Sequence, residues 1–174
     1  MKVGRYFLSV SEHWHQLSFF LEQYGCRDCL EFRGIPVSVK EDTSDLICKV
    51  ASLVGVEITA ADISTSHRIK PKTDLSKFPP PIIAKFVSRD TRDEVYRARG
   101  KLRDFSTKDL NNLGRLAVNP MFISESLTEM NEKLFKSALS CKKDLKYQFI
   151  WTHNGNIFLR KNTSSPNKIR ASTC

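Results

Sequence analysis

The sequence predicts an α+β protein, and three observations carry that prediction. Strand-like and helix-like segments alternate from about residue 29 to residue 124. An Asn-Gly pair at 154–155 lies between two runs of branched and aromatic residues, which is typical of a β-hairpin. Apolar residues between positions 7 and 24 recur at steps of three and four, as they do in an amphipathic helix.

The N-terminal segment, residues 1–25, is predicted to be an amphipathic helix or the stub of a coiled coil. Its apolar residues follow an a/d heptad seam over more than two heptads: Phe7, Val10, Trp14, Leu17, Leu21 and Tyr24. Two interpretations stay open, a short coiled coil and a single helix lying on the protein. In the first, a weak homo-oligomer forms through Val10, Trp14, Leu17, Leu21 and Tyr24.

The central segment, residues 26–124, is organised around the run from Pro79 to Arg103. Its three consecutive prolines cannot lie inside a helix or a central strand, so they mark a boundary. Ile82–Val87 then reads as a buried strand, and Ser88 can cap a helix that runs to Leu102. The stripe of that helix that faces the core is Val95, Ala98 and Leu102. Basic residues occupy much of its remaining surface, namely Arg89, Arg92, Arg97, Arg99, Lys101 and Arg103.

The other central elements complete a βαββαβ order. Strands are predicted at Cys29–Gly34, Ile63–Lys70 and Met121–Ile123, and a helix follows the polar run 41–44 and ends near Gly55. This order is that of the ferredoxin-like fold, to which RNA-recognition domains belong. It predicts a four-stranded sheet with two helices on one side and an open face on the other.

A second small domain is predicted at residues 125–162. Ser126-Leu127-Thr128-Glu129 has the pattern of a capping box at the start of a helix. The hairpin that follows places Trp151 opposite Phe158 and Ile150 opposite Leu159. Its two faces then carry Tyr147, Phe149, Trp151, Phe158 and Arg160 on one side, and Ile150, Ile157 and Leu159 on the other. Residues 163–174 read as a disordered tail.

Charge favours a polyanionic partner. The net charge is +9, and the stretch from Ile63 to Arg103 alone holds 11 Lys and Arg against 4 Asp and Glu. Five cysteines at irregular positions do not form a disulfide framework, which indicates a reducing compartment. No signal peptide and no membrane span is recognised. We expect a cytoplasmic or nuclear protein without a membrane partner.

The residues expected on the open face of the sheet do not support base stacking. Glu31 occupies the usual stacking position, and Pro81, Ile83 and Lys85 face outward on the central strand. His67 is expected on the same face as Ile63, packed in the core. A phosphate-binding surface with little sequence specificity remains, built from Arg33, Arg68, Lys85 and the basic helix.

The C-terminal hairpin offers a second surface. Trp151 or Phe149, beside Arg160 and Lys161, could stack on bases and hold phosphate. The favoured alternative is that these aromatic rings pack against the preceding helix, because an isolated hairpin needs a packing partner.

Catalytic, cofactor and metal sites are not expected. The pair Cys26-x-x-Cys29 lacks a second pair of ligands at zinc-site spacing, and His13 and His15 point to different sides of a helix. No phosphate-binding glycine loop and no nucleophile elbow is present. We therefore predict a protein that is not an enzyme and needs no cofactor or metal.

The order of several short motifs resembles a known family. The motifs are LEQYGCRDCLEFRGIP (21–36), DISTSHRI (62–69), PIIAKF (81–86), FISESLT (122–128) and IWTHNGNIF (150–158). Together they resemble the first-open-reading-frame proteins of LINE-type non-LTR retrotransposons over about residues 17–161. The last motif also looks like the C-terminal domain of baculovirus few-polyhedra (FP) proteins.

The resemblance implies a non-sequence-specific binding protein for single-stranded RNA or DNA, of the retrotransposon ribonucleoprotein and chaperone type. It also implies an RNA-recognition-like domain, a C-terminal domain and a trimerising coiled coil. Family contacts to RNA correspond here to Arg68, Lys85, Arg97, Arg99 and Lys101, with Arg160 and Lys161 in the C-terminal domain. The alternative is an FP-like interaction or scaffold protein that works through self-association and protein partners.

Overall fold

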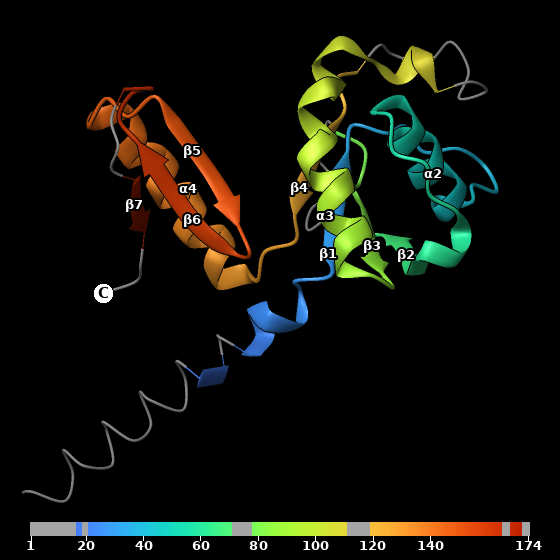
Figure 1. Cartoon of the computed structure of the whole chain (residues 1–174), viewed down its shortest axis with the longest axis horizontal. Helices are drawn as coiled ribbons and strands as arrows, with labels where there is room; N and C mark the ends of the chain where they lie inside the picture. The colour runs from blue at the N-terminus through green and yellow to red at the C-terminus, as the bar shows by residue number, and fades with distance from the viewer. Residues whose placement is uncertain (1–16, 19–20, 71–77, 111–118, 165–167, 172–174) are drawn as a thin grey trace, which may run out of the picture. The chain divides into compact units, whose positions relative to one another are not determined.

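The computed structural model describes residues 17–18, 21–70, 78–110, 119–164 and 168–171. It is a mixed α+β structure with two antiparallel sheets, as the sequence predicts (Figure 1). The chain divides into two compact units. We call Asp28–Ser126 the central unit, and Met1–Arg27 together with Leu127–Cys174 the terminal unit.

The central unit contains a four-stranded sheet in the order β2-β3-β1-β4, in which all neighbours are antiparallel. Its elements follow the chain as β1 (Cys29–Arg33), α2 (Thr43–Leu53), β2 (Ile63–Arg68), β3 (Ile82–Phe86), α3 (Arg89–Ala98) and β4 (Phe122–Glu125). Short 3-10 turns lie at Ala60–Asp62, Arg99–Asp104 and Thr107–Asp109. The predicted order of strands and helices is therefore present.

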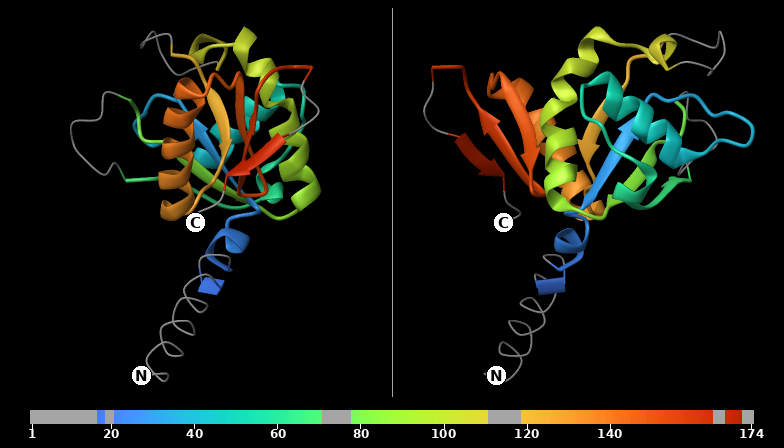
Figure 2. Two further views of the ribbon diagram at one scale, coloured as in Figure 1. Left: turned by 90° about the vertical axis from the view of Figure 1, so that its left-hand side faces the viewer. Right: turned by 45° about the vertical axis from the view of Figure 1, so that its right-hand side comes forward.

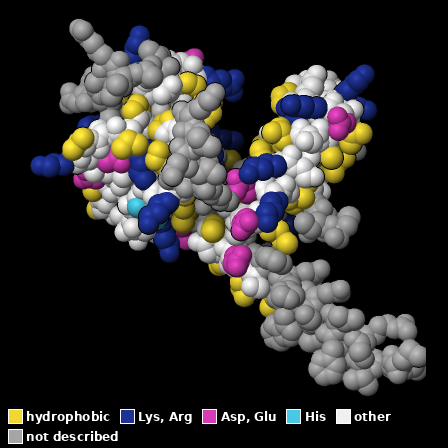
Figure 3. All heavy atoms as spheres, turned by 180° about the vertical axis from the view of Figure 1, so that it is seen from behind, with side chains coloured by type: hydrophobic (Ala, Val, Ile, Leu, Met, Phe, Trp, Pro, Cys, Tyr) yellow, Lys and Arg dark blue, Asp and Glu magenta, His cyan; other side chains and the backbone are white. Residues whose placement is uncertain are grey.

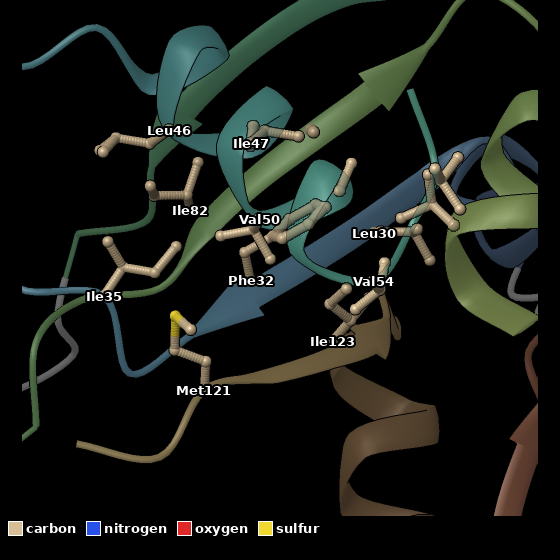
Figure 4. Close-up of a cluster of buried hydrophobic side chains, with 14 of the residues drawn as sticks. Leu30, Phe32, Ile35, Leu46, Ile47, Val50, Val54, Ile82, Met121 and Ile123 are labelled. Atoms are coloured by element: carbon tan, nitrogen blue, oxygen red, sulfur yellow. The ribbon is translucent and has the colours of Figure 1, made fainter. Parts of the chain in front are cut away.

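One face of this sheet forms the core with α2 and α3. Leu30 and Phe32 of β1 and Ile82 of β3 are at most 1% exposed. Ile47 and Val50 of α2 point toward them (Figure 4). Successive strand residues face opposite ways, so the alternate positions of β1 and β3 form the second face.

The two helices begin where their caps place them. The carboxylate of Asp42 accepts hydrogen bonds from the backbone N–H groups of Ser44 and Asp45, and Ser88 accepts one from Asp90. The second helix is shorter than predicted, because α3 ends at Ala98 and the chain continues as the 3-10 turn Arg99–Asp104. Gly100 lies in that turn, where its weak helix propensity favours the change.

A β-bulge in β2 changes which side chains face the core. Ile63 pairs with Phe86, but Thr65 already pairs with Lys85, so Ser64 is an extra residue in the ladder. Every later residue of β2 therefore faces the side opposite to the one that simple alternation predicts.

The terminal unit contains helical residues 21–25, the helix α4 (Glu129–Asp144) and a three-stranded sheet in the order β5-β6-β7. Its strands are β5 (Phe149–His153), β6 (Asn156–Arg160) and β7 (Lys168–Ala171). Helix α4 packs on one face of the sheet (Figure 2). Thr128 caps α4 through a hydrogen bond from the backbone N–H of Asn131.

The hairpin has the predicted turn and register. Asn154 and Gly155 both have positive φ, 52° and 74°, as a type I′ turn requires. Trp151 pairs with Phe158 and Ile150 with Leu159, which confirms both predicted pairs.

Two expectations for this unit were wrong. Residues 168–171 are the strand β7 and not part of a disordered tail, because they pair with the free edge of β6. Tyr147 does not share the face of Phe149 but packs against the core of the unit. The left-handed backbone of Lys146, with φ 56°, lies between α4 and β5, so strand alternation does not extend back to Tyr147.

The side-chain amide of Gln23 joins the N-terminal helix to the rest of the terminal unit. Gln23 is 8% exposed, and its Oε1 accepts hydrogen bonds from the N–H of Thr128 and the Nδ2 of Asn131, at 3.0 and 2.9 Å. The same Nδ2 donates to the carbonyl of Gly155 at 3.2 Å. Gln23 thus connects its own helix, the start of α4 and the hairpin turn.

Candidate nucleic-acid interface

Arg68 lies on the core side of β2 because of the bulge, and its guanidinium is bound within the protein. Nε and Nη2 donate to the two carboxylate oxygens of Glu41 at 2.6 and 2.8 Å. Further bonds reach the carbonyls of Ile35, Pro36 and Pro80. The Arg68 side chain is 12% exposed. It therefore ties two loops together and does not offer a free cation to a phosphate.

This ion pair also changes the acidity of its carboxyl group. The hydrogen bonds that Arg68 donates lower the pKa of Glu41 below its ordinary value, against an opposing effect of burial. Glu41 precedes the N-cap Asp42 directly, so the pair fixes β2 to the start of α2.

His67 is exposed on the face of the sheet opposite the helices, paired with Ile83. The expectation of a packed histidine was wrong, because the bulge reverses the alternation between Ile63 and His67. Lys85 is exposed on the same face, next to Thr65 on β2 and Cys29 on β1.

An aromatic ring that the sequence analysis missed also lies on this face. Phe122 of β4 is 58% exposed and pairs with Arg33, whose side chain is 53% exposed. Glu31 has the predicted orientation but is only 7% exposed, and its carboxylate accepts a hydrogen bond from Arg33 Nη2. The usual stacking positions of such a sheet lie on its first and third strands, so a ring at the start of β4 falls outside that pattern.

We name this surface the sheet face, defined by the exposed residues Arg33, His67, Lys85 and Phe122. Figure 3 looks at the molecule from behind and shows Lys and Arg side chains spread over the visible surface.

The basic helix is a separate surface, because α3 packs against the opposite side of the sheet. Arg97 is exposed there. Arg99 is partly exposed, donates to the carbonyl of Tyr96 at 2.6 Å and lies 3.8 Å above the Tyr96 ring. The ammonium of Lys101 donates to the carbonyl of Val54 at 2.9 Å. The structure thus does not bring the predicted set together: Lys85 lies on one side of the sheet, and Arg97, Arg99 and Lys101 lie on the other.

Arg92 was wrongly assigned to the outer surface of the basic helix. It is 2% exposed and bonds to the buried carboxylate of Glu125 on β4 at 2.8 Å and to Asp93 at 2.8 Å. Arg92 lies three residues before Val95, on the same inward stripe, and Glu125 faces the core as the partner of Leu30.

In the terminal sheet, the hairpin aromatics lie away from α4. Ile157 and Leu159, with Ile150 beside them, pack against Ala138 and the neighbouring apolar residues of α4. Trp151 and Phe158 are on the opposite face by alternation and stack on each other, with ring centroids 5.7 Å apart. The favoured interpretation that these rings pack against the helix was therefore wrong.

The predicted cations of this sheet differ in their surroundings. Arg160 is partly exposed, lies 5.7 Å from the Phe149 ring and donates to the carbonyls of Asn162 and Thr163. Lys161 is exposed just after β6. Arg170, which the sequence analysis did not consider, pairs with Phe158 from β7 and is exposed.

Three residues of the predicted oligomerisation seam are described, and all are exposed. Leu17, Leu21 and Tyr24 are 43%, 60% and 49% exposed. Val10 and Trp14 lie outside the described residues.

Three further observations concern metal ligands, helix hydropathy and a thiol in the described part of the chain. No group of three or more His, Cys, Asp or Glu residues there could hold a metal ion. No described helix combines the length and hydropathy of a membrane span. Burial, with nearby acidic residues, raises the pKa of the Cys48 thiol above its ordinary value, which is the opposite of what an activated nucleophile needs.

Comparison with known proteins now adds one match. Residues 128–171 match the family model described as Baculovirus FP protein domain 2. This segment is similar to an FP domain. It contains α4 and all three strands of the terminal sheet, and it confirms the FP part of the resemblance for these residues. No curated protein matches the chain. Nothing found supports the retrotransposon part of the resemblance, which stays a prediction.

Proposed function

We propose that this protein binds single-stranded nucleic acid, RNA or DNA, with little sequence preference. The observation that carries the proposal is the sheet face, where Arg33, His67, Lys85 and Phe122 are exposed together on the side of the sheet away from the helices. Cations beside an exposed ring suit phosphates and an unpaired base. Arg97 supplies a second cationic position on the helix side.

We further propose that the central unit has the ferredoxin-like arrangement of RNA-recognition domains. Its element order and its strand order β2-β3-β1-β4 support this assignment. The residues are unlike those of the usual stacking sites on β1 and β3, since Glu31 and Ile83 occupy the middle of the sheet face. Binding would then depend mainly on phosphates, in line with the retrotransposon ribonucleoprotein role that the resemblance implies.

Fluorescence anisotropy with two unrelated single-stranded oligonucleotides, measured across a salt series, tests the proposal. Both should bind with similar affinity, and log affinity should fall against log salt with a slope of about 0.7 per phosphate neutralised. Lys85→Gln should reduce that slope by about 0.7 if Lys85 contacts a phosphate.

Two further variants show which surface contacts the nucleic acid. Arg97→Gln tells whether the strand also follows α3, which lies on the other side of the sheet from Lys85. Lys133→Gln is the control, because Lys133 is paired with Glu129 on α4, and binding should not change. Failure of both oligonucleotides to bind at low salt would overturn the proposal and favour the FP-like interaction protein.

A further inference from the structure

One face of the terminal sheet lies opposite the side on which α4 packs. The core of the terminal unit is made by Ile157, Leu159 and Ala138 with the apolar residues around them, all on the α4 side. Phe149, Trp151 and Phe158 face the other way, and Phe149 is 41% exposed. Three aromatic rings thus lie on the face of the sheet away from the described core of this unit.

The strand β7 adds a cation to this face. Residues directly opposite each other in an antiparallel pair share a face, so Arg170 lies beside Phe158 and in one row with Trp151. The next row holds Phe149 and Arg160, whose guanidinium is held near the ring by the carbonyls of Asn162 and Thr163. Each row thus contains an arginine beside an aromatic ring.

We propose that this face, formed by Phe149, Trp151, Phe158, Arg160 and Arg170, is a base-stacking site for single-stranded nucleic acid. Aromatic faces stack unpaired bases of any sequence, and neighbouring guanidinium groups neutralise the backbone phosphates. Bases within a duplex are already stacked on each other, so the site takes single strands. The proposal rests on the proposed function, and it assigns base contact to the terminal unit, separate from the phosphate contacts of the sheet face.

The intrinsic fluorescence of Trp151 reports on this site directly. The full chain carrying Trp14→Phe leaves Trp151 as its one tryptophan. An oligothymidylate of about twelve nucleotides should quench it, whereas an abasic strand with the same number of phosphates should bind more weakly and leave the fluorescence unchanged. Phe149→Ala should weaken oligothymidylate binding by about tenfold or more. Arg170→Gln should weaken the binding of both the oligothymidylate and the abasic strand.

Control variants separate binding from folding. Phe78→Ala removes a ring that is 78% exposed in the central unit, and it should leave the affinity unchanged. Trp151→Phe keeps a stacking ring and should retain most of the affinity. Circular dichroism should show that each of these variants is folded. Salt-sensitive binding in which the abasic strand binds equally well and the Trp151 signal stays constant would overturn the stacking site while leaving the proposed function intact. No binding of either strand would overturn both and indicate a protein ligand for this face.

Discussion

One extra residue in β2 determines which side of the sheet the side chains of His67 and Arg68 face. Ser64 breaks the alternation of β2, so His67 reaches the surface and Arg68 turns to Glu41. The sequence pattern of β2 contains no signal for this bulge, because its residues from Ser64 to His67 are all polar. The side of the sheet that a residue faces cannot be predicted for such a strand. It can be predicted for β1, where the apolar Leu30 and Phe32 alternate with the charged Glu31 in the sequence.

The Glu41–Arg68 pair should make stability depend on acidity. The pKa of Glu41 is lowered in the folded state, so its stabilising contribution is present above the ordinary pKa of 4.5 and is lost as the pH falls through the folded value. Glu41→Gln should lower the free energy of unfolding at pH 7 by about 1–3 kcal/mol, and by less at pH 3. Urea unfolding at the two pH values measures this. Equal losses at both would show that the charge of Glu41 is unimportant.

The buried Arg92–Glu125 pair should be sensitive to the loss of one partner. Both side chains are 2% exposed, so Glu125→Ala leaves a guanidinium in the core with Asp93 as its one remaining ion-pair partner among the described residues. We expect a loss of about 3–5 kcal/mol in the free energy of unfolding. The double change Arg92→Met with Glu125→Leu should recover much of it. A chemical denaturation series in which the double variant is less stable than Glu125→Ala would contradict this account.

At the scale of elements, turn and proline residues predicted strand boundaries and register better than overall composition did. The Asn154-Gly155 turn fixed the register of β5 and β6, and the prolines before Ile82 marked the start of β3. The strand β7 was missed because the alternating run Lys168–Ala171 is only four residues long and follows a polar segment, and it forms by pairing with the edge of β6. The aromatic face of the terminal sheet could be listed from the register, but its orientation relative to α4 depended on which side Ile157 and Leu159 packed.

The hairpin turn gives a test at this scale. Gly155 has φ 74°, and a Cβ there would come within 2.4 Å of the Gln23 side chain. Gly155→Ala should therefore destabilise the protein by more than about 1 kcal/mol. Gly100→Ala is the matched control, because nothing lies within 4 Å of its Cβ position and its φ is not positive, so it should be neutral or slightly stabilising. Thermal unfolding measures the melting temperatures of both variants. Equal melting temperatures would contradict the role assigned to Gly155.

At the scale of the whole molecule, the net charge of +9 indicated the type of partner but not the residues that meet it. Charge counting gives every arginine the same weight. The fold instead buries Arg92, commits Arg68 to Glu41 and leaves Lys85 and Arg97 exposed on different sides of a sheet. A cation's availability depends on its packing, which the composition does not encode.

The N-terminal helix should associate only weakly. Its seam residues Leu17 and Leu21 are exposed and could meet a second copy, yet a seam of little more than two heptads seldom holds chains together alone. Sedimentation should show mostly monomer at low concentration, and Leu21→Asp should remove what association there is. Because Gln23 ties this helix to the terminal unit, association would bring several terminal sheets together and raise the affinity for a long strand. A tight trimer abolished by Leu17→Asp would show instead that the seam is a dominant interface.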